Sequence, residues 1–133
     1  MTPLDVMRSY IAAMQQGDRE AAFGHFSDDV VGYVPGRSPL AGEQRGREAV
    51  EGYIRAAIAH AHGNVELELI DTLAGQEHVA LLVRERLTAD GRVLDMRRVN
   101  VYRVRDGKIV EIRIFEGDQY AVDAFFGAPP AGE

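Results

Sequence analysis

Apolar side chains recur every three or four residues in the first half of the chain, which predicts helices there. Thr2 is placed to cap the first helix, and Pro3 suits its first turn. Asp18 is expected to cap a short second helix, which Ser27–Asp29 is expected to close. The predicted helices therefore cover residues 3–16, a short stretch after Asp18, and residues 47–60.

Beyond Gly63 the pattern changes to the two-residue alternation that is typical of strands, as in the segment VELEL at 65–69. Asp-Gly pairs at 90–91 and 106–107 predict tight hairpin turns, because such turns need residues that tolerate positive φ. A run of strands after a run of helices predicts an α+β domain. The expected strands are 30–34, 64–73, 77–88, 92–103 and 108–117, with residues 35–46 as a loop and 119–126 as a last short helix.

The length of 133 residues is that of one domain, expected here over residues 1–126. The small, proline-rich segment 127–133 is expected to be a flexible tail. The net charge of −6 argues against a nucleic-acid partner. No apolar run is long enough to span a membrane and the N-terminus has no signal-peptide pattern, so we expect a cytoplasmic protein without a membrane partner.

The chain contains no cysteine, which excludes a disulfide framework and a thiolate metal site. His60 and His62 are spaced so that they point in different directions on a helix, and His25 and His78 have no neighbours at ligand spacing. No phosphate-binding or dinucleotide-binding motif is present, so we expect neither a metal nor a cofactor. Lys108 is the only lysine beside 14 arginines; this bias reflects either a GC-rich genome or recognition of a carboxylate or phosphate.

Several strings resemble those of one superfamily in their order and spacing. They are YIAAMQQGD at 10–18, FSDD at 26–29, GREAV at 46–50 and VYRVRDGKIVE at 101–111. Over residues 4–126 the chain resembles the SnoaL-like and ketosteroid-isomerase-like proteins of the nuclear transport factor 2-like superfamily. The resemblance implies a cone, in which a strongly curved antiparallel sheet wraps around N-terminal helices and encloses an apolar pocket. It also implies a homodimer and a small apolar organic ligand.

The resemblance to ketosteroid isomerase assigns roles to individual positions. It places the tyrosine that binds the oxyanion at Tyr10 and the protonated aspartic acid at Asn100, whose amide can donate a hydrogen bond. The general base of that enzyme falls on Val34, which cannot accept a proton. The resemblance to SnoaL-like cyclases places an acid/base carboxylate beside Gly117, at Glu116 or Asp118. The expected catalytic residues are therefore Tyr10, Asn100, Glu116 and Asp118.

Strand parity predicts which side chains share a face with Asn100, because side chains alternate along a strand. A two-residue turn at 90–91 places Leu81, Val83 and Glu85 opposite Asn100, Arg98 and Met96, respectively. A three-residue loop would instead turn the other face of strand 77–88 toward the pocket. Arg98 then either orients a ligand or pairs structurally with Glu85 or Glu116. The residues expected to bind substrate are Met14, Tyr33, Val34, Tyr53, Val83, Glu85, Met96, Arg98, Ile112 and Ile114.

These expectations point to a small-molecule pocket protein. The leading hypothesis is a cofactor-independent isomerase or cyclase that acts by acid/base chemistry on an apolar, carbonyl-containing compound of polyketide or steroid type. The absent base at Val34 favours an alternative, a non-catalytic ligand-binding or dimerisation module. A hydrolase or hydratase that opens an epoxide is a third hypothesis.

Overall fold

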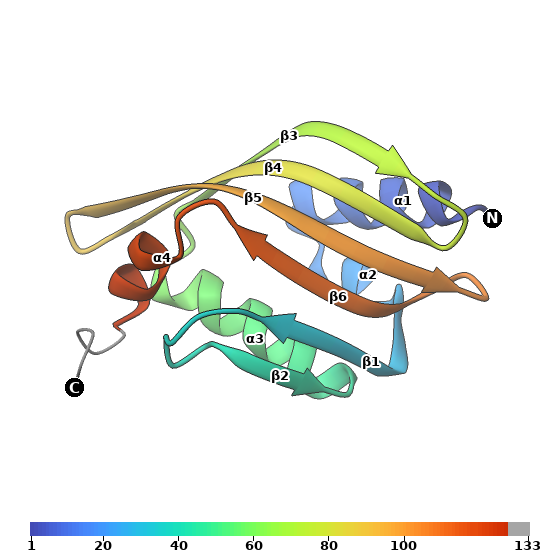
Figure 1. Cartoon of the computed structure of the whole chain (residues 1–133), viewed down its shortest axis with the longest axis horizontal. Helices are drawn as coiled ribbons and strands as arrows, with labels where there is room; N and C mark the ends of the chain where they lie inside the picture. The colour runs from blue at the N-terminus through green and yellow to red at the C-terminus, as the bar shows by residue number, and fades with distance from the viewer. Residues whose placement is uncertain (128–133) are drawn as a thin grey trace.

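A computed structural model describes residues 1–127 of the chain (Figure 1). From residue 128 onward, the tail expected over 127–133 lies outside the described residues. The helices are α1 (Pro3–Gln15), α2 (Arg19–Phe23), α3 (Arg47–His60) and α4 (Gln119–Phe126). The strands are β1 (Phe26–Val34), β2 (Gly42–Arg45), β3 (Val65–Ala74), β4 (His78–Ala89), β5 (Arg92–Arg105) and β6 (Lys108–Glu116).

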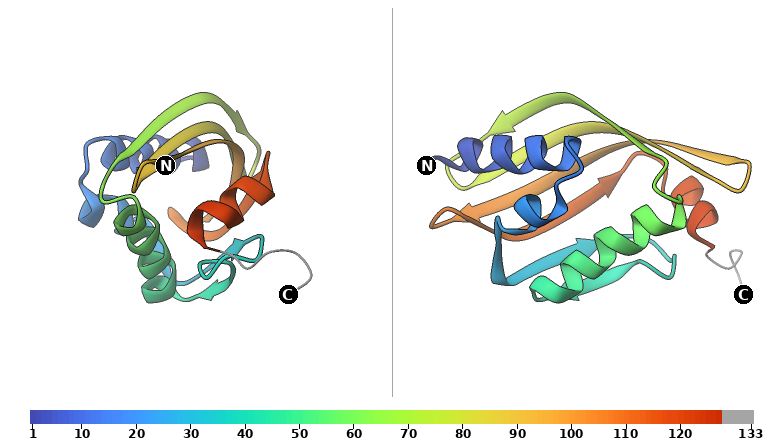
Figure 2. Two further views of the ribbon diagram at one scale, coloured as in Figure 1. Left: turned by 90° about the vertical axis from the view of Figure 1, so that its left-hand side faces the viewer. Right: turned by 180° about the vertical axis from the view of Figure 1, so that it is seen from behind.

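The strands form one curved, unclosed sheet in the order β2-β1-β6-β5-β4-β3. Neighbouring strands are antiparallel except β1 and β6, which run parallel. The sheet arches over α1 and α3, and α4 lies at the end of the molecule where the β4–β5 hairpin projects (Figure 2). This arrangement confirms the predicted α+β cone, with a sheet that is mostly antiparallel.

The register between β4 and β5 is the one that the two-residue turn predicts. Asp90 and Gly91 both adopt positive φ, at 52° and 78°, as a tight turn of this kind requires. Leu81 pairs with Asn100, Val83 with Arg98, and Glu85 with Met96. The alternative three-residue loop, which would have turned β4 over, is therefore wrong.

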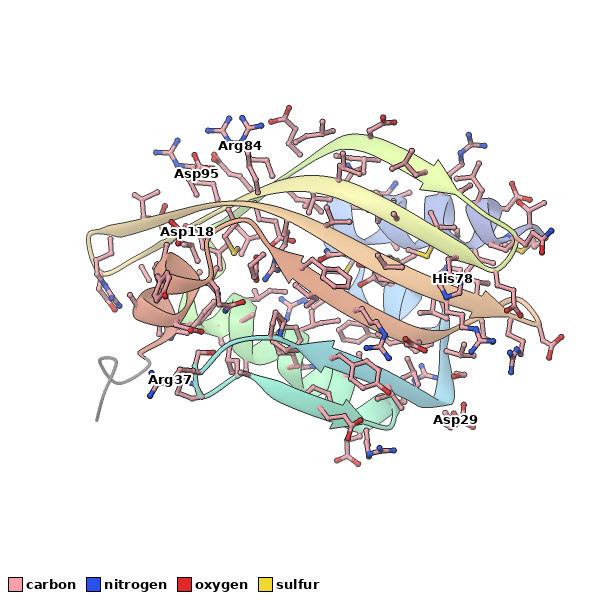
Figure 3. All side chains as sticks on the ribbon, in the orientation of Figure 1. Asp29, Arg37, His78, Arg84, Asp95 and Asp118 are labelled. Atoms are coloured by element: carbon pink, nitrogen blue, oxygen red, sulfur yellow. The ribbon has the colours of Figure 1, made fainter. Side chains whose placement is uncertain are left out.

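The core lies between the concave face of the sheet and the helices. Thr2 and Asp5 form a reciprocal capping box at the start of α1, and this helix buries Val6, Met7 and Tyr10 against the sheet. A second cluster lies beneath α4, where Val122 and Phe125 pack; its other buried members are Ala61, Leu87, Ala89, Leu94 and Met96. The outer face of the sheet carries ion pairs, among them Arg84, which is bound to both carboxylate oxygens of Asp95 (Figure 3).

Two predicted boundaries are wrong. Ser27–Asp29 belongs to β1 and does not close a helix, because α2 already ends at Phe23 and Phe26 is buried as the first residue of the strand. The polar run is accommodated where the β1–β6 register shifts, between Phe26 and Val31. The expected loop 35–46 contains β2, an edge strand without apolar alternation that is held by its pairing with β1.

Candidate functional site

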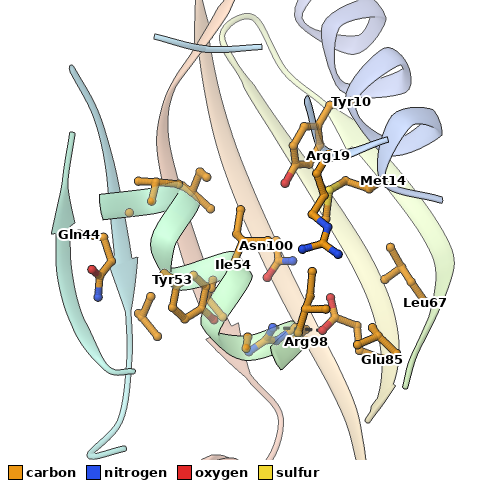
Figure 4. A pocket seen from close by; sticks show the side chains of 18 of the residues that line it. Tyr10, Met14, Arg19, Gln44, Tyr53, Ile54, Leu67, Glu85, Arg98 and Asn100 are labelled. Carbon is orange, nitrogen blue, oxygen red and sulfur yellow. Dashed lines mark hydrogen bonds and ion pairs between the residues drawn. The ribbon is translucent and has the colours of Figure 1, made fainter. Parts of the chain in front are cut away.

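A cavity of about 620 Å³ lies between the helices and the concave face of the sheet (Figure 4). This volume is in the range of pockets that bind small organic molecules. Tyr10 and Met14 enter it from α1, where they lie one helical turn apart, and Tyr53 and Ile54 enter it from α3. Its apolar wall includes Met14, Val34, Ile54, Leu67, Ile112 and Ile114.

A buried ion-pair cluster lies on the sheet side of this cavity. Arg98 faces Glu116 across the β5–β6 pair and binds it through two nitrogens, Nε to Oε1 at 3.0 Å and Nη2 to Oε2. Its third nitrogen, Nη1, donates to Oε2 of Glu85 at 3.4 Å. Burial opposes the charge of Arg98, but attraction by the two carboxylates dominates and raises the pKa of its guanidinium. Arg98 is therefore held as a cation, and structural pairing occurs with both carboxylates.

The two carboxylates of this cluster differ in exposure. The side chain of Glu116 is 2% exposed and lies outside the cavity lining, whereas that of Glu85 is 20% exposed and forms part of the lining. Glu85 uses only Oε2 toward Arg98, and its Oε1 accepts no hydrogen bond from the described residues. Glu85 is thus the carboxylate that a molecule in the cavity would meet.

Tyrosine hydroxyls line the same cavity. The rings of Tyr10 and Tyr102 lie 5.7 Å apart, and Tyr53 approaches from α3. Burial raises the pKa of Tyr10 and of Tyr102. Burial also raises the pKa of Tyr53, and the Arg98 guanidinium offsets only part of that rise. All three phenols are kept protonated, which makes them available as hydrogen-bond donors.

Asn100 presents an unpartnered polar atom on the sheet side of the cavity. The residue is 7% exposed, lines the cavity and points into it from β5 (Figure 4). It shares a face of β5 with Tyr102, which lies two residues further along the strand. Its Oδ1 is buried and accepts no hydrogen bond from the described residues. Because an unsatisfied buried acceptor is costly, this oxygen is suited to receive a hydrogen bond from a ligand.

Many of the predicted site residues are gathered around this cavity. The proposed catalytic residues Tyr10 and Asn100 are among them. Of the expected substrate-binding residues, the lining includes Met14, Tyr33, Val34, Tyr53, Glu85, Arg98, Ile112 and Ile114. Tyr33 contributes only at the border, because its ring lies 4.0 Å from the guanidinium of Arg113, a neighbour in the β1–β6 register whose own position is exposed.

Other predicted site residues lie elsewhere. Asp118 is the N-cap of α4, and its Oδ1 accepts a hydrogen bond from the backbone N–H of Ala121 at 3.1 Å. Glu116 is on the expected face but lies behind Arg98. Val83 is packed in the main core, and Met96 lies in the cluster beneath α4, because the long β4–β5 hairpin extends past the cavity.

Arg19 and Gln44 are among the polar residues of the lining that sequence reasoning missed. Arg19 directly follows the recognised cap Asp18, but its direction depends on how the five-residue helix α2 is oriented. Gln44 lies in β2, which has no recognisable strand pattern. Neither residue carries a local signal that could have revealed its position.

The described part of the chain holds neither a metal-binding cluster nor a membrane-spanning helix. Among residues 1–127, no three histidine, aspartate or glutamate side chains are grouped closely enough to hold a metal ion. No helix in the same range is long and apolar enough to cross a membrane.

The protein is an α+β cone whose cavity is lined by both apolar and polar side chains. The sequence profile of the SnoaL-like domain matches residues 7–112, and the chain belongs to this family. An uncharacterised protein of Mycobacterium tuberculosis is 32% identical over 124 residues, which cover 92% of this chain and 95% of that protein.

Solved structures agree with this assignment. A protein of unknown function with a cystatin-like fold from Xanthomonas campestris is 33% identical, with a TM-score of 0.89 over 96% of this chain and 99% of the other. TerC, crystallised with polyporic acid, is 16% identical, with a TM-score of 0.80 over 95% and 98% of the two chains. Other matched structures are described as nuclear transport factor 2-like, which is the fold of this protein.

Proposed function

We propose that this protein is a cofactor-independent enzyme of the isomerase or cyclase type. Its substrate is a mostly apolar, carbonyl-containing molecule of polyketide or steroid type, on which it moves a proton. One observation carries the proposal: Glu85 is the only carboxylate in the cavity lining formed by residues 1–127, and one of its oxygens is unengaged there. The acid/base role thus moves to Glu85 from Glu116 and Asp118, which are occupied by an ion pair and a helix cap.

The proposed step is an enolisation. Oε1 of Glu85 takes a proton from the carbon next to the carbonyl group, the C–H electron pair forms the enolate double bond, and the carbonyl oxygen gains the charge. Tyr10 and Tyr53 remain protonated at neutral pH and can donate to this oxygen. Glu85 then returns the proton to a different carbon. Arg98 acts as a positioning residue that fixes the Glu85 carboxylate.

Asn100 has a different part from the one expected. Its Oδ1 is buried and has no partner among the described residues, so it accepts a hydrogen bond from the substrate instead of donating one to an oxyanion. A hydroxyl or enol group on the substrate would supply that proton.

The test is proton exchange on an enolisable ketone, β-tetralone, in D₂O. Loss of the α-proton signal is followed by NMR with the wild-type protein, with Glu85→Gln and with Glu111→Gln. Glu111 is a matched control, because it is also a strand glutamate paired with an arginine but lies outside the cavity lining. We expect Glu85→Gln to lower the protein-dependent exchange by about 100-fold or more and Glu111→Gln to leave it unchanged. Equal exchange by wild type and Glu85→Gln would remove Glu85 from the mechanism.

A second candidate is a non-catalytic ligand-binding module. It is favoured by the pairing of Arg98 with both carboxylates, which engages the one carboxylate of the described cavity lining in a structural ion pair. Binding of β-naphthol without any protein-dependent exchange on β-tetralone would support this candidate over the enzyme.

We also propose that the protein is a homodimer formed through the outer face of the sheet. Phe115 on β6 is 55% exposed, which leaves an apolar ring available for such a contact. Sedimentation of the wild type and of Phe115→Asp tests this; we expect a dimer for the first and a monomer for the second.

A further inference from the structure

Arg19 is a second guanidinium at the cavity, and it differs from Arg98 in being unengaged. It is the first residue of α2, and its side chain extends into the cavity (Figure 4). Arg98 is bound by two carboxylates, whereas Arg19 forms no ion pair or hydrogen bond with the described residues. A guanidinium directed into a pocket without a partner is a group that a ligand can engage.

The chemistry of Arg19 selects an anion. Its planar fork binds a carboxylate through two parallel hydrogen bonds, and such charge-assisted bonds are stronger than neutral ones. Residue 19 is exposed, so the charged end of a ligand would remain hydrated at the mouth while its apolar body enters the cavity. The charge of Arg98 is already paired with Glu85 and Glu116, which leaves Arg19 as the one unpaired cation in the described lining. One cation matches the single charge of a carboxylate better than the double charge of a phosphate.

An independent observation defines the other end of the ligand. Asn100 is 93% buried, since 7% of its surface is exposed, and its Oδ1 has no partner among the described residues. It lies in the wall of the same cavity as Arg19, with apolar side chains such as Met14 and Leu67 in the lining between α1 and the sheet. The cavity therefore offers one acceptor and one cation, with an apolar surface around them.

We propose that the ligand is a hydroxy acid with an apolar body: its carboxylate pairs with Arg19 and its hydroxyl or enol group donates to Oδ1 of Asn100. This inference rests on the proposed function in requiring that the cavity binds an organic molecule, and it deepens that function by naming the substrate class. Arg19 is thereby a specificity-determining residue, outside the proton-transfer machinery of Glu85.

The test compares three probes by isothermal titration: a hydroxynaphthoic acid, its methyl ester and β-naphthol. We expect the wild type to bind the acid about tenfold or more tightly than the ester. In Arg19→Gln this preference is lost, while affinity for the ester and for β-naphthol is unchanged. Arg8→Gln is the matched control, because Arg8 is an exposed arginine on α1 outside the lining of this cavity, and it should keep the full preference.

The outcomes separate the two proposals. Equal affinity of the wild type for acid and ester, or an equal loss for both in Arg19→Gln, overturns the assignment of Arg19 while binding of β-naphthol still supports the pocket. Absence of binding by all three probes overturns the pocket proposal itself. The donor end is tested with β-naphthol and its methyl ether: Asn100→Leu should abolish the preference for the naphthol, and retention of that preference would overturn the role of Asn100.

Discussion

Arg98 binds Glu116 through two of its nitrogens and Glu85 through only one, although both carboxylates face the same guanidinium. The difference follows from the sheet. Glu116 is the direct partner of Arg98 in the β5–β6 register, whereas Glu85 is paired with Met96 and reaches Arg98 obliquely. The geometry assigns a structural part to Glu116 and leaves an oxygen of Glu85 for the cavity.

Loss of the Glu116 charge should destabilise the protein more than loss of the Glu85 charge. Glu116→Gln leaves Arg98 largely unpaired in a buried position, so we expect the free energy of unfolding to fall by about 3 kcal/mol. Glu85→Gln should cost less, because its side chain is more exposed and makes one contact at 3.4 Å. Urea denaturation measures both, and a larger loss for Glu85→Gln would contradict this assignment.

Asp118 should contribute to stability and not to ligand binding. Asp118→Ala removes the hydrogen bond to the N–H of Ala121 and should lower the free energy of unfolding by about 1 kcal/mol. Asp118→Asn keeps a capping oxygen and should restore most of that loss. Affinity for β-naphthol should stay at the wild-type value in both, and a tenfold loss of affinity would return Asp118 to the site.

The buried tyrosines should make the protein less stable at alkaline pH. The pKa values of Tyr10, Tyr53 and Tyr102 are raised by burial, so the folded state favours the neutral phenol. Their contribution to stability is complete below the unfolded pKa of about 10 and is lost as the pH rises through the folded-state pKa.

Urea denaturation across this alkaline range measures the effect. Tyr102→Phe should reduce the loss of stability with pH, and Tyr120→Phe, at a position that is 87% exposed, is the control. An unfolding free energy that stays constant above pH 10, the ordinary pKa of tyrosine, would contradict the expected effect of burial.

Gly117 should not tolerate a side chain. A Cβ at this position would lie 2.7 Å from the backbone oxygen of Arg97, the same oxygen that accepts the N–H of Gly117 at 2.9 Å. Gly117→Ala should therefore destabilise the protein by about 1–3 kcal/mol. Gly52→Ala is a matched control on α3, where a Cβ meets nothing within 4 Å; it should be stabilising by about 0.5–1 kcal/mol. Thermal unfolding distinguishes the two signs.

The sequence pattern correctly predicted those elements whose structure is determined by residues close together in the chain. The Asp-Gly turn at 90–91 sets the β4–β5 register, and this register places Arg98 and Asn100 on the concave face. The helix predicted over 119–126 is also observed, because its apolar residues lie within the segment and its N-cap, Asp118, directly precedes it. These features depend on residues that are near one another in the sequence.

Features that the sequence did not reveal depend on long-range contacts. β2 exists because β1 supplies its hydrogen-bonding partner, and the edge strand itself has no apolar alternation. Met96 has the correct parity, but whether it faces the cavity or α4 depends on where the C-terminal helix returns. For Asp118 the sequence alone does not distinguish two roles, because an aspartate directly before a helix can serve as an N-cap or as a catalytic carboxylate. Only the position of the cavity separates these two functions.

The parallel contact between β1 and β6 joins a strand that begins at residue 26 to one that ends at residue 116. During synthesis, β1 is made long before β6. Phe26 and Val30 of β1 can therefore be fully buried only after β6 has been added to the sheet. A ribosome-bound fragment without β6 thus lacks the strand that joins β1 and β2 to the rest of the sheet. The cavity is completed only by β6, which supplies Ile112 and Ile114 to its lining, so a molecule that occupies the cavity can stabilise the fold only after residue 116 has been synthesised.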